Sequence, residues 1–117
     1  MVISILLIFP TREQRRELLG ILRSVQGPTE AQPHCRNCRI YEEAGYDEGV
    51  AYVEEWESEA DFHRHVRSDA YRRVLAAVEM SRMPPEIAFH RVSSTQGIEL
   101  IEELRGAPKR APEKQKG

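Results

Sequence analysis

The stretch of sequence that decides the fold is EEWESEADFHRHVRSDAY, residues 54–71. It begins as the end of a strand, turns at Ser58 and continues as a helix, because serine is a preferred residue just before a first helical turn. Trp56, the only Trp of the chain, lies at the strand exit, and His65 and then Tyr71 follow on the helical side. Aromatic and imidazole groups gathered at one strand-to-helix corner indicate a pocket.

The residues before this corner form a hairpin. Successive side chains of a strand point to opposite faces of the sheet, so residues 50–56 divide into two sets. One face carries Val50, Tyr52, Glu54 and Trp56, and the other carries Ala51, Val53 and Glu55. Residues 35–43 are predicted to be the partner strand, and residues 44–49 the turn between the two.

The first part of the chain predicts a strand and a helix. Residues 2–9 are almost wholly apolar, which is typical of a strand buried on both faces. Thr11 and Gln14 fit a capping box, so a helix is expected to begin there. Its apolar stripe is Leu18, Ile21, Leu22 and Val25, and Gly27 with Pro28 is expected to end it.

The second helical region is predicted over about residues 59–81, with a kink near Ser68 where Ser-Asp resembles a second N-cap. Phe62, Val66, Ala70, Val74 and Ala77 trace its apolar side, with Tyr71, Leu75 and Val78 beside them. Pro84 and Pro85 precede a last strand over residues 86–92.

The order is therefore β-α-β-β-α-β, an α+β, ferredoxin-like arrangement with two helices on one face of an antiparallel four-stranded sheet. We assign residues 1–95 to this domain, residues 96–105 to a C-terminal extension that is either helix or strand, and residues 106–117 to a disordered tail.

Length and charge exclude several classes of protein. The chain has 117 residues, enough for one domain, and a net charge of −2 with acids and bases interspersed. Nucleic acids and anionic membranes need a dense basic face, so neither is an expected partner. The apolar start lacks a basic leader and a small-residue cleavage site, and no apolar run is long enough to span a membrane, so we predict a cytoplasmic protein.

One face of the predicted sheet lacks a cover. Both helices lie on one side, yet both faces of the first strand are apolar. A second copy that packs through the same surface is the simplest cover, so we predict a homodimer with the two sheets facing each other.

The residues at the corner resemble those of a known family. The run from Val53 to Asp61, with His65, Ser68 and Tyr71 after it, is similar to the antibiotic biosynthesis monooxygenase family. The flanking segments CRNCRIY (residues 35–41) and PPEI (residues 84–87) resemble it too. The likeness covers roughly residues 1–95, and its motif is more specific for the fold than for a reaction.

The resemblance implies a dimeric α+β barrel. It also implies oxygenation of a small phenol or hydroquinone by molecular oxygen, with no metal, flavin or haem as cofactor. That chemistry needs a dry pocket with a base of near-neutral pKa, normally His, that deprotonates an electron-rich ring. A non-catalytic small-molecule-binding protein on the same scaffold is the alternative.

The candidate site residues follow from the corner. His65 is the candidate base; its alternative is a capping or buried, hydrogen-bonded His that ties the helix to the strand end. Tyr71 is an alternative proton carrier. Trp56, Tyr52, Glu54 and Phe62 are candidates for lining the substrate pocket, and Trp56 also has a packing role. A buried Glu54 needs a partner, which either Arg39 or Arg91 on the neighbouring strands could supply. His63 is expected to be solvated, and His90 to be an ordinary strand residue.

Other cofactor sites are not expected. Cys35 and Cys38 open a strand rather than a helix, and residues three apart in a strand face opposite sides about 10 Å apart, which is too far for a disulfide. Two cysteines alone are also short of a zinc site. Relatives that degrade haem carry a ligating His where this chain has Leu75, and a first-strand Asn that it lacks, so haem is not expected.

Overall fold

The structure is a computed structural model that describes residues 1–45 and 49–106. Its elements in chain order are β1 (Val2–Ile8), α1 (Arg15–Glu30), β2 (Cys35–Glu42), β3 (Val50–Trp56), α2 (Glu59–Arg67), α3 (Tyr71–Val78), β4 (Glu86–Arg91) and α4 (Ile98–Arg105). The predicted β-α-β-β-α-β order is confirmed, with the second helix divided in two. None of the helices within the described ranges has the length and apolarity needed to cross a membrane.

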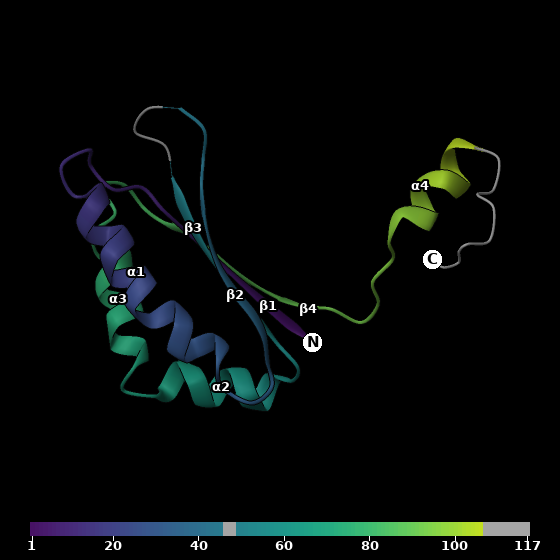
Figure 1. Ribbon diagram of the computed structural model, residues 1–117, viewed down its shortest axis with the longest axis horizontal. Coiled ribbons are helices and arrows are strands. Elements are labelled where there is room, and N and C mark those ends of the chain that lie inside the picture. Colours follow the sequence, from purple (N-terminus) through teal and green to yellow (C-terminus); the bar gives the residue numbers. More distant parts are fainter. Residues whose placement is uncertain (46–48, 107–117) are drawn as a thin grey trace.

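The four strands form one antiparallel sheet in the order β2-β3-β1-β4. Helices α1, α2 and α3 lie on one side of this sheet (Figure 1). The register between β1 and β3 places Val2 opposite Trp56, Ser4 opposite Glu54, and Leu6 opposite Tyr52. These residues are buried. The face of β3 that carries Val50, Tyr52, Glu54 and Trp56 is therefore the face under the helices.

Helix α1 differs from the prediction at both ends. The Thr11 hydroxyl accepts a hydrogen bond from the Gln14 amide at 3.2 Å, but this bond closes a turn, and the helix begins at Arg15. Pro28 lies inside the helix, which continues to Glu30. Pro28 has no N–H to donate, so one helical hydrogen bond is missing in the last turn. The helix tolerates this loss because later amides still donate to helix carbonyls: the Ala31 amide donates to the Gly27 carbonyl at 3.0 Å.

The kink predicted near Ser68 is a complete break between α2 and α3. Ser58 caps α2, and its hydroxyl accepts from the Asp61 amide at 3.2 Å. Ser68 is extended, with φ −75° and ψ 157°, and its hydroxyl donates to the His65 carbonyl at 2.6 Å. Ser68 therefore closes α2 rather than capping α3, so its predicted role as an N-cap is wrong.

The core lies between the sheet and the helices. Its larger part joins β1 and β3 to α1 and α3, and a smaller cluster of Val2, Trp56 and Phe62 lies at the α2 end. The other face of β1 carries Ile3, Ile5 and Leu7, which are only half-buried in the single chain. The expected burial of β1 on both faces is thus met on the helix side alone, because none of the described helices covers the opposite side.

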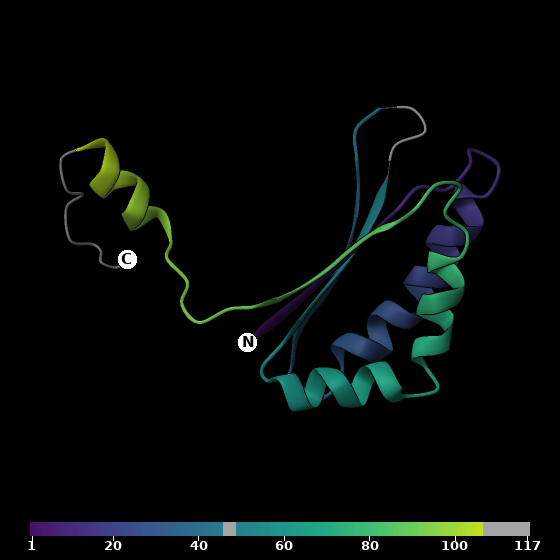
Figure 2. The same ribbon diagram turned by 180° about the vertical axis from the view of Figure 1, so that it is seen from behind.

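The C-terminal extension leaves the domain. After β4 the chain runs outward and ends in α4, which lies well apart from the rest (Figures 1 and 2). The molecule accordingly measures 50 × 36 × 21 Å. Of the two alternatives for the extension, the helix is the one observed. The predicted disordered tail lies, from residue 107 onward, outside the described residues.

Candidate functional site

A buried carboxylate-imidazole pair lies at the strand-to-helix corner. The His65 Nε2 atom lies 3.0 Å from Glu54 Oε2, and the Trp56 indole N–H donates to Glu54 Oε1 at 2.9 Å. Glu54 is 1% exposed and His65 is 3% exposed. Both oxygens of Glu54 thus accept a hydrogen bond, which is what a buried carboxylate requires.

The local sequence explains why these groups meet. Glu54 and Trp56 are two residues apart on β3, so both point under the helices. Ser58 turns the chain back over the sheet, and His65 lies on the same side of α2 as Phe62, one turn earlier, so both face the strand. The expected partners of Glu54 are wrong: it is paired with His65 and Trp56, and Arg91 pairs with Glu59 instead.

Two aromatic rings hold the His65 imidazole in place. The Trp56 ring lies at a centroid distance of 4.7 Å, and the Tyr71 ring meets the imidazole edge-on at 5.2 Å. Offset and edge-on contacts of this kind are the favourable arrangements for aromatic rings. The corner therefore brings together Trp56, His65 and Tyr71, as the sequence predicted.

The second nitrogen of His65 defines its protonation pattern. The Gln32 side-chain amide lies 3.4 Å from Nδ1. An amide nitrogen can only donate, so Nδ1 is the acceptor and Nε2 carries the proton that is donated to Glu54. This is the orientation in which a carboxylate supports an imidazole as a base, with the lone pair of Nδ1 directed away from the carboxylate. Gln32 is half-buried, in the short loop after α1, and no sequence signal marked it.

The Glu54 charge affects the other acidic groups of the site. Burial, and then the Glu54 carboxylate, raise the pKa of Tyr71 to about 12. The same two causes, in the same order, raise the pKa of Tyr52 far above its ordinary value. A neighbouring negative charge disfavours a second one. Tyr71 is thus a neutral phenol at neutral pH, and its role as a proton carrier, like that of His65 as the base, stays a prediction.

Ser4 is a residue of the site that the sequence reasoning missed. It lies opposite Glu54 in the sheet and is 1% exposed, and its hydroxyl is the one buried side-chain polar atom with no hydrogen-bond partner among the described residues. Such an atom costs free energy unless something bonds to it. The signal was available: Ser4 is the single polar residue within the apolar run of residues 2–9.

The remaining predicted pocket residues lie around this pair. Phe62 is buried and packs on Phe89 of β4 at a ring distance of 5.3 Å. Tyr52 is fully buried in the larger core cluster, where its hydroxyl accepts from the Cys38 thiol at 3.1 Å. Tyr52 thus points to the same side of the sheet as Glu54, but its hydroxyl is hydrogen-bonded to Cys38 of β2.

The two cysteines share a face of β2, contrary to the prediction. Cys35 pairs with Trp56 and Cys38 pairs with Glu54, because a bulge between Cys35 and Asn37 adds one residue to this strand. The pair faces the core, and both thiols are free. Burial raises the pKa of Cys35 to about 11 and that of Cys38 to about 12, so neither has the thiolate character of a redox site. Within the described ranges, no group of three or more His, Cys, Asp or Glu side chains could hold a metal ion.

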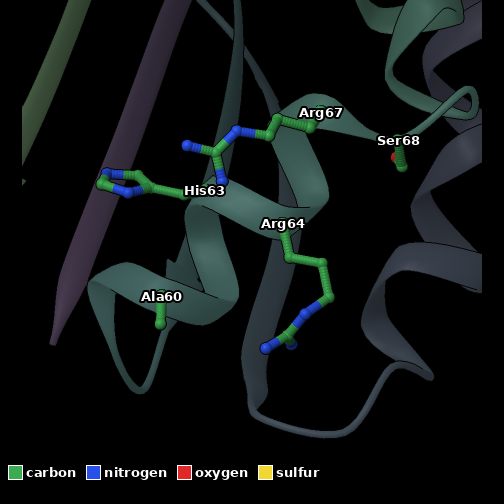
Figure 3. Close-up of a pocket in the computed structure, with 5 residues that line it drawn as sticks. All are labelled: Ala60, His63, Arg64, Arg67 and Ser68. Atoms are coloured by element: carbon green, nitrogen blue, oxygen red, sulfur yellow. The ribbon is translucent and has the colours of Figure 1, made fainter.

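Two open hollows of the surface lie away from the buried pair. One of about 630 Å³ lies on the outside of α2 and is lined by Ala60, His63, Arg64, Arg67 and Ser68 (Figure 3). Another, of about 340 Å³, lies beside β2 and is lined by Gln26, Glu30, Cys38, Arg39, Ile40 and Tyr41. His65 lines neither of them. His63 is exposed, as expected.

The family follows from comparison with known proteins. Residues 1–77 match the model of a family described as "Antibiotic biosynthesis monooxygenase". The chain belongs to this family. The match contains the whole corner, from Glu54 to Tyr71, and therefore confirms the resemblance on which the site was predicted. No curated protein matches the chain significantly.

Solved structures of this family's fold are similar to the chain. Rv0793 from Mycobacterium tuberculosis has a TM-score of 0.72 and 22% identity, over 82% of this chain and 98% of that one. A conserved protein from Methanosarcina mazei has a TM-score of 0.68 and 22% identity, over 78% and 92%. A structure described as an antibiotic biosynthesis monooxygenase has a TM-score of 0.70 and 18% identity, over 80% and 100%. At these identities the likeness shows the fold.

Proposed function

We propose that this family member is a cofactor-independent monooxygenase that oxidises a small phenol or hydroquinone with molecular oxygen. The observation that carries the proposal is the buried Glu54-His65 pair, in which the lone pair of Nδ1 faces a long contact, 3.4 Å, to Gln32. A substrate hydroxyl in place of the Gln32 amide would present its proton to Nδ1. His65 is the base in this proposal, and Trp56, Phe62 and Tyr71 are walls of the site.

The charges of the site suit a proton transfer that is completed within it. A phenolate in this site would be disfavoured, because burial and then the Glu54 charge both raise the pKa of a phenol there, as they do for Tyr71. Transfer of the phenol proton to Nδ1 places an imidazolium between the carboxylate and the phenolate, so the site keeps the same net charge. Glu54 thus holds the imidazole with Nδ1 towards the substrate and is a positioning residue in this scheme.

The reaction balances without a cofactor. The substrate anion gives one electron to O₂, and the resulting radical and superoxide combine at a ring carbon. The imidazolium returns the proton, which gives a ring hydroperoxide. Loss of water then yields the quinone, so one oxygen atom enters the product and the other leaves as water. The substrate itself supplies the electrons.

Oxygen uptake by the purified, metal-free protein tests this proposal. With a panel of phenols and hydroquinones, we expect uptake above the autoxidation blank for at least one, and one ¹⁸O atom from ¹⁸O₂ in the quinone formed. No uptake above the blank with any of them would contradict the proposal. An absorption spectrum of bound flavin or haem in the active protein would contradict its cofactor-free part.

One observation favours a non-catalytic binding protein as the second candidate. Trp56 and Tyr71 fill the space on two sides of His65, and a filled core beside His65 is what a structural histidine would have. A ligand that raises the melting temperature without any oxygen uptake would identify this alternative.

Ser4 provides a further test at the same site. We add to the proposal that the unpaired Ser4 hydroxyl bonds to the substrate, so Ser4→Ala is expected to raise KM about threefold to thirtyfold with a smaller change in kcat. The same substitution removes an unpaired buried hydroxyl, so the free energy of unfolding should rise or stay within about 0.5 kcal/mol. Steady-state kinetics and urea unfolding measure the two effects. A clear loss of stability with unchanged KM would show that the hydroxyl has a structural partner.

The homodimer and the cytoplasmic location stay predictions. The uncovered face of the sheet, with Ile3, Ile5 and Leu7 half-buried on it, supports the former.

A further inference from the structure

Most of the neighbours of the His65 ring are buried, but one of them is partly exposed. Among the described residues, Glu54, Trp56 and Tyr71 bond to the imidazole or stack on it, and each is at most 4% exposed. Gln32, whose side-chain amide lies 3.4 Å from Nδ1, is only half-buried. The way from solvent to the Nδ1 lone pair therefore leads past the Gln32 side chain.

The backbone on both sides of Gln32 is held in place. The Gln32 amide donates to the Thr29 carbonyl at 3.1 Å, and the Cys35 amide donates to the Gln32 carbonyl at 3.2 Å. The same loop passes beside α2 (Figure 1), and there the Glu57 amide donates to the His34 carbonyl at 2.9 Å. The loop is thus tied to α1, to β2 and to the corner, so the part of Gln32 that can move is its side chain.

A side-chain bond reinforces this attachment of the loop. The His34 imidazole is bonded to the Glu57 carboxylate, with Nδ1 3.0 Å from Oε1. His34 has a φ of 73°, in the left-handed region that residues other than glycine rarely adopt. Two hydrogen bonds to Glu57, one from each residue's backbone and one between the side chains, hold it there. The loop is therefore a fixed support for Gln32.

The bond that keeps the Gln32 side chain over His65 is a weak one. Most N–H donors in proteins lie about 2.9–3.0 Å from their acceptor, and this one lies at 3.4 Å. A half-buried amide that turns outward can bond to water instead, so it does not stay unsatisfied. Rotation of such a side chain takes picoseconds to nanoseconds and needs no change of the backbone.

From these contacts we infer that the Gln32 side chain is the gate of the site. Turned inward, it covers Nδ1 of His65, and turned outward it opens the way from solvent to that atom. With the gate closed, both ring nitrogens of His65 are hydrogen-bonded. Admission of a phenolic hydroxyl to Nδ1 is the part of this inference that rests on the proposed function. The gate itself controls the access of any small molecule to His65.

Chemical labelling of histidine tests the gate without a substrate. Diethyl pyrocarbonate acylates an unprotonated imidazole nitrogen that it can reach, and peptide mapping by mass spectrometry distinguishes His65 from the exposed His63. Relative to His63, the labelling rate of His65 is expected to rise about tenfold in Gln32→Ala, because an open state populated to about 10% becomes the only state. Gln96→Ala, which changes an exposed glutamine beyond β4, is the control and should leave this ratio unchanged.

Gln32→Asn separates loss of the gate from loss of the fold. Its amide is one methylene shorter and does not reach Nδ1, but the loop keeps a polar side chain. We expect the same rise in His65 labelling, with the melting temperature and the Trp56 fluorescence of the wild type. Equal His65 labelling in the wild type and both variants would overturn the inference. A rise confined to Gln32→Ala and accompanied by altered Trp56 fluorescence would also overturn it, because the corner itself would then have loosened.

Oxygen uptake separates the gate from the proposed chemistry. With an active phenol, Gln32→Ala is expected to lower KM about threefold to tenfold with a smaller change in kcat, because no closed state has to be displaced. Faster labelling of His65 without uptake for any phenol would uphold the gate and contradict the proposed function. Uptake by the wild type, with His65 labelling and KM both unchanged in Gln32→Ala, would uphold the function and overturn the gate.

Discussion

Replacing Glu54 with alanine is expected to lower the free energy of unfolding by about 3–5 kcal/mol, because it removes one partner of a buried polar pair. The Trp56 indole N–H and the His65 Nε2–H both donate to this carboxylate, at 2.9 and 3.0 Å. Without it two buried donors lose their acceptor, and each unsatisfied group costs about 1–3 kcal/mol. The cavity left by the shortened side chain adds to the loss.

Urea unfolding, followed by the fluorescence of Trp56, measures this change, because Trp56 is the only Trp. Glu55→Ala is the matched control: the residue is adjacent on β3 but points to the other face and is half-buried. We expect that control to stay within about 1 kcal/mol of the wild type. A loss below about 1 kcal/mol for Glu54→Ala would mean that the pair is not formed in solution.

Glu54→Gln separates charge from hydrogen bonding. An amide has one acceptor oxygen, so it can accept from Trp56 but then presents its NH₂ group to His65 Nε2. To accept there, His65 must move its proton to Nδ1, which faces the Gln32 amide, also a donor. We therefore expect the stability of Glu54→Gln to lie between those of the wild type and Glu54→Ala. We also expect this substitution to impair His65 as a base, because it changes how the imidazole is held.

The sequence predicted the corner well because its signals are local. Alternation placed Glu54 and Trp56 on one buried face, and Ser58 before an acidic first turn marked the start of α2. Both depend on residues a few positions apart, where the geometry of a strand or a helix fixes which way each side chain points.

The errors at the two ends of α1 and at Ser68 are local, whereas several others depend on how distant parts of the chain meet. Arginines on neighbouring strands were suggested as partners of Glu54 because strand neighbours can be predicted from the sequence pattern. The true partner, His65, depends on the angle at which α2 crosses β3, and the sequence pattern does not give that angle. The bulge at Cys35 leaves no mark in the sequence, yet it reverses the expected facing of the two thiols. Val66 fits the apolar side of α2, but its burial depends on whether anything covers β4.

The same pair can serve structure and chemistry at once. A carboxylate that satisfies Trp56 and His65 stabilises the corner, and it also fixes the imidazole with Nδ1 as the acceptor. Stability measurements on Glu54 therefore do not distinguish an enzyme from a binding protein. A substitution at His65 that preserves its hydrogen bond to Glu54 is needed for that distinction.

His65→Gln is this substitution, and we expect it to lower kcat/KM for the best substrate by about 10²–10⁴-fold, the range over which a positioned general base acts. The glutamine amide can still donate to Glu54, so the corner should fold, with a melting temperature lowered by a few degrees. It cannot take up the phenol proton, so the step that forms the substrate anion loses its acceptor.

The pH profile distinguishes a base from a merely structural histidine. A general base must be unprotonated to act, so catalysis by such a base gives the kcat/KM profile of the wild type a limb that rises with pH. In His65→Gln that rise should disappear, and the residual rate should follow the ionisation of the free phenol. His63→Gln, an exposed histidine of the same helix, is the control and should leave both rate and profile unchanged. If His65→Gln instead kept the wild-type rate and profile while it lost stability, His65 would be a structural residue of the corner, and the proton would have to go to another group.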